Sequence, residues 1–275
     1  MGTVWTPALF ALFVWWFSTG AILVAVKRAD RRGPGAHLRS TLLALPLLAV
    51  GASGFWTSQS DASVGGTYVA FLSALALWAW VEMAFLTGVI TGPNRRPCPA
   101  GIPEWERFLR AWGTIAYHEC VLVGVLIGLT LSSWNSVNHF GLWTFGVLFA
   151  ARISAKLNIF LGVPRINVEF LPSPLAHLPS HFRIAPMNWL YPVSVTLLAL
   201  AVGCWLERVL ASSSAANDTG FVLLAALTAL ALLEHWFMVL PLPDAKLWRW
   251  MLPQPRSAAL KPKQDPMIRE DAHGL

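Results

Sequence analysis

The sequence predicts an all-α fold, a polytopic membrane bundle of seven transmembrane helices, and three observations support this prediction. Hydrophobic residues make up 56% of the 275 residues and charged residues only 12%, roughly half the share usual in soluble domains. The mean hydropathy is +0.56, and the chain contains 15 Trp, a residue that favours the membrane–water boundary. Apolar runs of membrane-spanning length recur along the whole chain. These observations argue against a soluble globular protein.

The apolar runs define seven spans, each placed to within a few residues. The first is expected to remain as a helix, because no basic residue precedes it and no A-x-A cleavage site follows it. The second contains Pro46, which a membrane helix tolerates where neighbouring groups satisfy the freed carbonyl. The predicted spans are 6–26, 40–57, 67–91, 111–132, 137–157, 190–210 and 220–240.

The distribution of Lys and Arg predicts the orientation of the spans. Every basic residue except Arg208 lies in or beside alternate connections, and the connections 58–66, 133–136 and 211–219 contain none. Basic residues mark the cytoplasmic side of membrane proteins. We therefore expect the N-terminus outside and the C-terminus in the cytoplasm. The net charge of +6 then follows from the cytoplasmic connections, so membrane lipids and not nucleic acid are the expected contacts.

Two segments on the predicted cytoplasmic side stand apart from the spans. The connection 158–189, within a membrane domain of residues 1–252, carries five prolines that exclude a continuous helix. Its interleaved apolar residues predict an ordered segment on the bundle or on the bilayer surface, and loops of this length are often functional. The polar tail 253–275 is expected to be disordered and cytoplasmic.

Five ionisable residues lie inside the predicted spans, where charge is costly. Glu82 is in the third span, His118 and Glu119 are in the fourth, and Glu234 and His235 are in the seventh. At about 1.5 Å rise per residue, all five fall in one layer roughly 9–12 Å from the cytoplasmic ends of their helices. Because the fourth and seventh spans run in opposite directions, both Glu of the Glu–His pairs lie one step deeper than their His neighbours.

Three interpretations of this layer remain open. Carboxylates with imidazoles suit iron, manganese or zinc, or the Mg of a tetrapyrrole such as bacteriochlorophyll, so all five residues are candidate metal ligands. Adjacent residues diverge by about 100° around a helix, unlike the Glu-x-x-His pairs of di-iron bundles. The same residues could instead form ion pairs that fix helix packing, with Arg152 as a further partner, or a path for protons or ions.

Other residues carry weaker signals. His177 and His181 have i, i+4 spacing, but Pro179 breaks the helix that would align them, so surface positions are expected. Gly124 and Gly128 form a small-residue stripe that predicts close helix contact. The three cysteines are far apart and predict neither a disulfide framework nor covalent attachment of haem.

Four stretches of the chain together resemble a known family. They are TPALFALFVWWFSTGAI at 6–22, LNIFLGVPRINVEFLP at 157–172, PMNWLYPVSVT at 186–196 and LEHWFMVLPLPDAKLWRW at 233–250. These stretches are similar to the PuhE family of photosynthetic-complex assembly proteins in anoxygenic phototrophic bacteria, over residues 6–252. The resemblance implies a multi-pass protein of the bacterial cytoplasmic membrane, inner or intracytoplasmic. It also implies a role in biogenesis of the reaction centre and its antenna, whose subunits would be its partners.

The residues that match the family include Glu119, Asn158, Glu169 and the pair Glu234 and His235, and the resemblance carries no catalytic role for them. Asn158 and Glu169 are candidates for binding a cofactor. For Glu169, and for its neighbour Asn167, capping of the polar layer from below is one interpretation, and a solvated position in the loop is the default. The expected function is assembly of photosynthetic complexes, with a metal or a Mg-tetrapyrrole held at the layer. The alternative is a membrane-bound di-metal oxidase or hydroxylase acting on a lipid-soluble quinone, carotenoid or tetrapyrrole.

Overall fold

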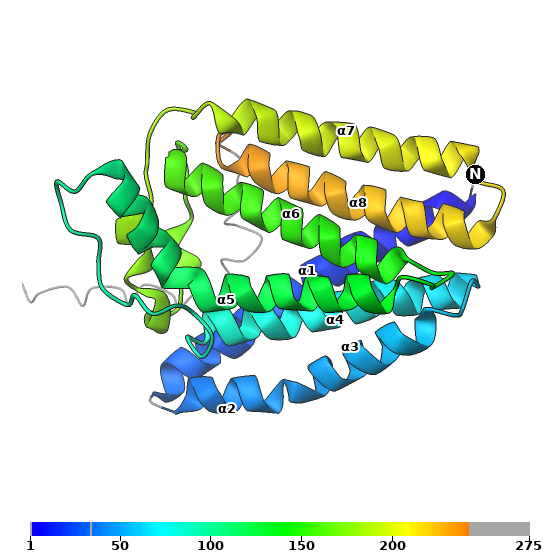
Figure 1. Ribbon diagram of the computed structural model, residues 1–275, viewed down its shortest axis with the longest axis horizontal. Helices are drawn as coiled ribbons and strands as arrows, with labels where there is room; N and C mark the ends of the chain where they lie inside the picture. The colour runs from blue at the N-terminus through cyan, green and yellow to red at the C-terminus, as the bar shows by residue number, and fades with distance from the viewer. Residues whose placement is uncertain (1, 34, 242–275) are drawn as a thin grey trace, which may run out of the picture.

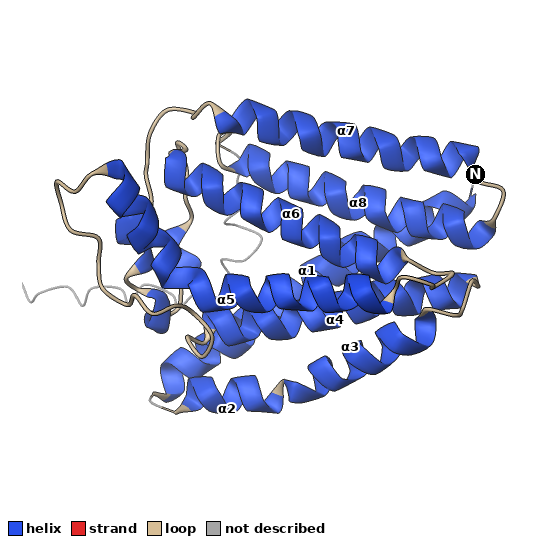
Figure 2. Cartoon of the chain, viewed as in Figure 1, coloured by secondary structure: helices blue, strands red, loops and turns tan. Residues whose placement is uncertain are grey.

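The computed structural model describes residues 2–33 and 35–241 as a bundle of helices aligned along one axis (Figure 1). Within these ranges, seven helical segments are long and apolar enough to span a membrane, and no strand occurs (Figure 2). The all-α fold with seven spans is therefore confirmed. The predicted tail 253–275 lies outside the described residues.

The helices follow the predicted spans with shifted ends. They are α1 (Gly2–Arg32), α2 (Ala36–Leu43), α3 (Leu45–Ser58), α4 (Val64–Leu86), α5 (Glu104–Ser132), α6 (Phe140–Leu161), α7 (Leu190–Ala211) and α8 (Ala215–Phe237). α5 begins before the apolar run, because Glu104 and Glu106 in its first turn are favourable at the positive end of the helix dipole. α4 ends earlier than predicted. Gly88, at φ 75°, turns the chain after Leu86, and its N–H donates to the carbonyl of Phe85 at 2.8 Å.

The second span is divided into α2 and α3 by a break at Ala44. Pro46 lies in the first turn of α3, where its missing N–H removes no helical hydrogen bond. The N–H of Ala44 donates to the carbonyls of Ser40 at 3.1 Å and Thr41 at 3.2 Å, which closes the end of α2. The segment Ala36–Ser58 still counts as one span, so Pro46 interrupts the helix without ending the span.

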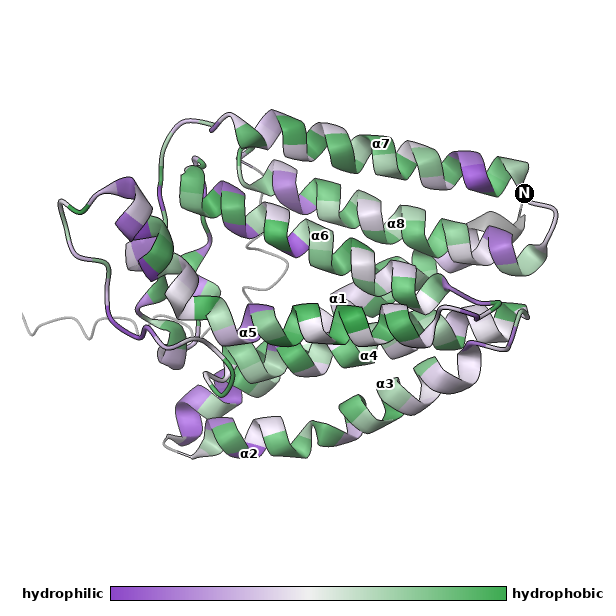
Figure 3. Cartoon of the chain, viewed as in Figure 1, coloured by the Kyte–Doolittle hydropathy of each residue, from purple (hydrophilic) through white to green (hydrophobic). Residues whose placement is uncertain are grey.

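α4 and α8 form the centre of the bundle. Their most apolar windows are 56% and 61% buried, compared with 6% for α7. α8 packs against α1, α6 and α7, and α4 packs against α3 and α6 (Figure 1). Gly220 of α8 lies so close to the ring of Phe140 that no side chain fits between them. Hydrophobic residues cover the surfaces of the outer helices, as contact with lipid requires (Figure 3).

The connections that lack Lys and Arg meet at one end of the bundle. The side-chain amide of Asn138 donates to the carbonyl of Asp61 at 2.9 Å, and the hydroxyl of Thr67 donates to the carbonyl of Ala216 at 3.4 Å. The connections rich in basic residues lie at the opposite end (Figure 1). The structure thus bears out the alternation of basic and uncharged connections. The assignment of the basic end to the cytoplasm stays a prediction.

The connection after α6 is ordered and packs on the basic end of the bundle. It contains three short 3-10 helices, η1 (Val168–Phe170), η2 (Ser173–Leu175) and η3 (Leu178–His181). Leu175 and Leu178 are buried in a cluster with Phe85 of α4. The expectation of an ordered segment lying on the bundle is therefore confirmed, and apolar contacts are its main support.

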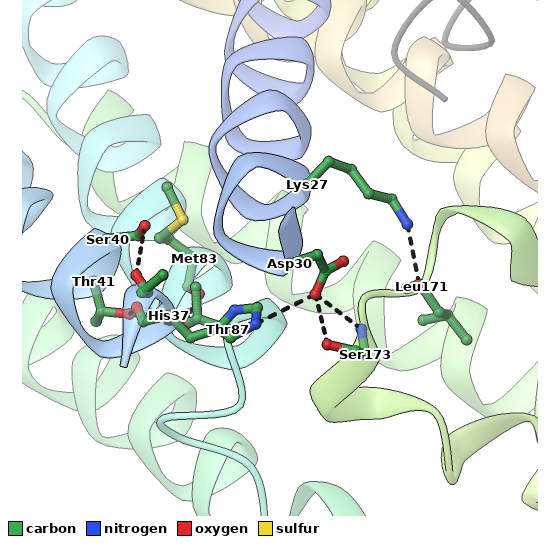
Figure 4. A network of polar contacts seen from close by, with 10 residues as sticks. Lys27, Asp30, His37, Ser40, Thr41, Met83, Thr87, Leu171 and Ser173 are labelled. Atoms are coloured by element: carbon green, nitrogen blue, oxygen red, sulfur yellow. Dashed lines mark hydrogen bonds and ion pairs between the residues drawn. The ribbon is translucent and has the colours of Figure 1, made fainter. Parts of the chain in front are cut away.

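A set of polar contacts, the Asp30 network, attaches this connection to the end of α1 (Figure 4). One carboxylate oxygen of Asp30 accepts from the Ser173 N–H at 3.1 Å and from its hydroxyl at 2.7 Å. The same oxygen lies 3.3 Å from Nε2 of His37 in α2. Lys27 Nζ donates to the carbonyl of Leu171 at 3.2 Å. One helix end therefore holds both the connection and α2.

Candidate ligand cavity

Glu82, on α4, is paired with a cation from α6. Arg152 Nη2 donates to Glu82 Oε2 at 2.9 Å, and Nε2 of His118 lies 3.7 Å from Oε1. His118 is fully buried, with its ring centroid 4.5 Å from that of Phe85. Neither ring nitrogen of His118 has a hydrogen-bond partner in the described part of the chain. Arg152 is thus confirmed as an ion-pair partner within the layer.

Glu119, on α5, is paired with a second cation from α6. Lys156 Nζ donates to Glu119 Oε1, and the two charges form an ion pair. Lys156 is absent from the layer that the sequence predicts. Its i, i+4 spacing from Arg152 places both cations on one face of the helix, and this spacing is a signal that could have identified it. α6 therefore supplies one cation to each of its two acidic neighbours.

His235 joins three helices through hydrogen bonds and has no free nitrogen for a ligand. Nδ1–H donates to the carbonyl of Ala231 at 2.8 Å, because a carbonyl can only accept. Nε2 then accepts from the hydroxyl of Ser154 in α6 at 2.9 Å. The hydroxyl of Tyr191 in α7 donates to the carbonyl of His235 at 3.1 Å. These contacts give His235 a packing role.

The two candidate cofactor-binding residues make no hydrogen bond to Glu82, Glu119 or Glu234 in the described structure. Asn158 is fully buried between α6 and α7, where its amide donates to the hydroxyl of Ser194 at 2.9 Å and its oxygen accepts from Asn188 at 3.1 Å. Glu169 is exposed in η1, and its backbone carbonyl accepts from Lys27 Nζ at 3.5 Å. Asn158 thus holds the start of α7, and Glu169 is solvent-exposed, as the default interpretation of a loop residue predicts.

Glu234 differs from the other two carboxylates because no cation is paired with it among the described residues. Its one direct partner there is the indole of Trp15 in α1, whose Nε1–H donates to Oε1 at 3.1 Å. The side chain of Glu234 is accessible, whereas Glu82 and Glu119 are buried. An accessible carboxylate at this depth is available to a bound ligand.

The five predicted metal ligands do not gather at one point. In the described ranges, no group of three or more His, Cys, Asp or Glu is placed to hold a metal ion. Glu82 and Glu119 each pair one carboxylate oxygen with Arg152 or Lys156, so a metal ion at either carboxylate would lie beside a positive charge. The arrangement therefore does not fit a metal centre with several protein ligands.

A cavity of about 1010 Å³ opens beside the two ion pairs. Residues of α1, α4, α5, α6, α8 and the connection after α6 line it, and most of them are apolar or aromatic. Its volume lies at the upper end of the range for small-molecule sites, about 300–1,000 Å³. Its charged lining residues are Glu119, Arg152, Lys156, Arg165 and Glu234. The geometry suits a large apolar ligand with a few polar contacts.

Gly124 belongs to the wall of this cavity, and the predicted helix contact at the glycine stripe is wrong. A Cβ atom added at Gly124 or Gly128 would meet no heavy atom within 4 Å in the described structure. Gly124 lines the cavity together with Val123 and Ile127. The physical reason is that small residues permit close helix approach but do not enforce it, and no described helix packs against this face of α5.

His181 is buried, so the predicted surface position is also wrong. Its exposed fraction is 3%, and it lines the cavity from η3. Nε2–H donates to the carbonyl of Arg96 at 3.2 Å. Burial lowers the pKa of His181, which favours the neutral ring. The prolines that break the helix fold the connection back under α5, and this reversal carries His181 inward.

Comparisons with known proteins give a family and one relative. Residues 1–259 match the model of a family described as "Protein of unknown function (DUF3623)". A protein of Rhodobacter capsulatus named "Uncharacterized 30.4 kDa protein in puhA 5'region" is 58% identical over 253 residues, which cover 92% of this chain and 92% of that protein. No solved structure matches the chain.

Proposed function

Since the chain belongs to the DUF3623 family and a relative has a name that refers to puhA, we propose that it is an assembly factor for photosynthetic reaction centre and antenna complexes. The relative comes from a phototroph, and puhA is a photosynthesis gene. The resemblance of four stretches to the PuhE family supports the same role. The protein then acts in the bacterial cytoplasmic membrane, where subunits of these complexes are its partners.

The cavity is the observation that supports a specific mechanism, in which the protein binds a cofactor before the cofactor enters a complex. An assembly factor that handles cofactors needs a site for a large lipid-soluble molecule, and the cavity lies in the part of the bundle formed by spanning helices. Bacteriochlorophyll is such a molecule, and its macrocycle suits a wall that includes Phe108, Trp112 and Phe160. The protein holds the pigment until a partner subunit takes it.

The alternative of a di-metal oxidase or hydroxylase is less well supported. Such an enzyme needs two metals held by several carboxylates and imidazoles, with an open coordination position. Glu82 and Glu119 are in contact with Arg152 and Lys156, and His235 is fully hydrogen-bonded. Two of the carboxylates and one of the imidazoles that such a reaction needs are therefore engaged in contacts between helices, whereas both ring nitrogens of His118 lack a hydrogen bond in the described structure.

A substitution that fills the cavity tests the proposal. Gly124→Trp adds a large side chain at a point where no described atom stands in the way, so the fold is retained while the cavity loses volume. We expect the reaction centre and antenna absorption bands of membranes to fall to nearly the level of a strain that lacks the gene. The amount of the protein in the membrane should stay normal.

Gly128→Trp is the matched control, because Gly128 is one turn further along α5, is equally open and does not line the cavity. This variant should assemble photosynthetic complexes normally. Equal losses in both variants would point to the outer surface of α5, and normal complexes in the Gly124→Trp strain would contradict a role for the cavity.

A further inference from the structure

The carboxylate of Glu234, which forms no direct ion pair with a described residue, points to the kind of ligand that the cavity takes. Of the three acidic residues at this level, Glu82 and Glu119 have cations from α6, whereas Glu234 has only the Trp15 indole as a direct partner in the described structure. Both Trp15 and Glu234 line the cavity. The cavity thus contains a carboxylate whose second oxygen, Oε2, makes no direct contact with a cation of the described chain.

A carboxylate in a membrane-level cavity is costly unless a positive centre complements it. The surroundings are mostly apolar, so a hydrated small ion does not fit the rest of the cavity. A large apolar molecule with a positive centre satisfies both conditions. Mg chelated in a tetrapyrrole is such a centre, because Mg is a hard cation that prefers oxygen ligands.

We propose that Glu234 is the axial ligand of a Mg-tetrapyrrole bound in the cavity, through Oε2. Trp15 is a positioning residue, because its Nε1–H holds Oε1 and thereby orients the carboxylate. The charge of Glu234 then serves ligand binding, and the ion pairs of Glu82 and Glu119 serve helix packing. This proposal rests on the proposed function, since it assumes that a pigment enters the cavity.

The test compares two pigments that differ only at the macrocycle centre. The purified full-length protein in mild detergent is titrated with bacteriochlorophyll a and with its Mg-free form, bacteriopheophytin a, and binding is followed by absorption. The wild type should bind the Mg pigment at least about tenfold more tightly than the Mg-free pigment. Glu234→Ala should remove this preference and leave the affinity for the Mg-free pigment unchanged, which also shows that the cavity is intact.

Two further variants make the result specific. Glu234→His should restore part of the preference and shift the absorption band, because an imidazole can also ligate Mg. Trp15→Phe removes the donor to Oε1 and should weaken binding of the Mg pigment alone. Glu207→Ala is the control, because Glu207 is exposed on the outer face of α7 and lines no part of this cavity.

The outcomes separate this proposal from the proposed function. Equal affinity of the wild type for the two pigments, or an unchanged preference in Glu234→Ala, would overturn coordination by Glu234 and leave the cavity as a pigment site. Failure of the wild type to bind either pigment would refute the proposal that the cavity binds a pigment, and with it the proposal that Glu234 ligates Mg.

Discussion

Glu119 and Lys156 meet at the boundary between α5 and α6, where their side chains are only 10% and 18% exposed. Charges that are so enclosed lose much of their hydration, and each compensates for the other. Glu82 and Arg152 likewise form an ion pair between α4 and α6, and each compensates the charge of the other. These pairs explain how a membrane bundle retains acidic residues within its spans.

Removal of one member of the α5–α6 pair should destabilise the protein more than removal of both. Lys156→Met leaves Glu119 without its cation, at a cost of about 3–5 kcal/mol if the charge stays buried. The double variant Glu119→Met, Lys156→Met replaces the pair with apolar side chains and should recover most of this loss. Thermal unfolding of the purified proteins in detergent measures both effects. A double variant that is less stable than Lys156→Met would show that the carboxylate has another essential partner.

The connection after α6 is an element whose position depends on contacts from other helices. Its buried Leu175 and Leu178 pack on α4, and the Asp30 network attaches it to α1. Arg107 of α5 adds one contact to the connection, donating to the carbonyl of His181 at 3.3 Å, and a second to the last turn of α6, at the carbonyl of Phe160 at 3.0 Å. The connection therefore closes the basic end of the cavity by packing as well as by hydrogen bonds.

The Asp30 network should determine how firmly this connection is held. Asp30→Ala removes the acceptor for Ser173 and for His37, so segment 162–189 should open more often. We expect faster cleavage within that segment by an added protease, measured on inverted membrane vesicles. Arg28→Ala changes a charge on the same turn of α1, where no contact to the segment occurs in the described structure, and should cleave like the wild type. Similar rates for all three proteins would mean that the contacts of Asp30 do not determine how firmly the segment is held.

For the whole molecule, the bundle has one basic end and one end without Lys or Arg in its connections. At the uncharged end, the contact between Asn138 and Asp61 joins two connections, and the contact between Thr67 and Ala216 joins the first turns of α4 and α8. The cavity lies toward the basic end, since the connection after α6 lines it. If that end faces the cytoplasm, the proposed pigment site is reached from the cytoplasmic half of the membrane.

Labelling of single cysteines tests this orientation. In a background with Cys98, Cys120 and Cys204 changed to Ser, the variants Asp61→Cys and Ser213→Cys should react with a membrane-impermeant maleimide on intact spheroplasts. Arg31→Cys and Ile184→Cys should react only after permeabilisation. All four positions are exposed, so a failure to react reports the side of the membrane. Reaction of the variants at positions 184 and 61 from the same side would refute the seven-span topology.

The amino-acid sequence by itself determined the seven spans and the division into a basic and an uncharged end. Each of these properties belongs to a single segment, because the bilayer requires about twenty apolar residues and a helix rises by about 1.5 Å per residue. The tolerated Pro46 and the packed connection after α6 followed from the same local reasoning. The Gly88 cap and the break at Ala44 emerged only in the structure, because local hydrogen bonds set the ends of helices.

Only the tertiary structure decided which partners the ionisable residues have. Glu119 pairs with Lys156, His235 with Ser154 and Glu234 with Trp15, and none of these pairs is evident from position along the chain. The physical reason is that a helix surrounded by lipid is apolar on several faces, so the apolar pattern does not set its rotation about its own axis. That rotation, together with the identity of the neighbouring helix, determines whether a carboxylate forms an ion pair, as Glu119 does, or lines the cavity, as Glu234 does.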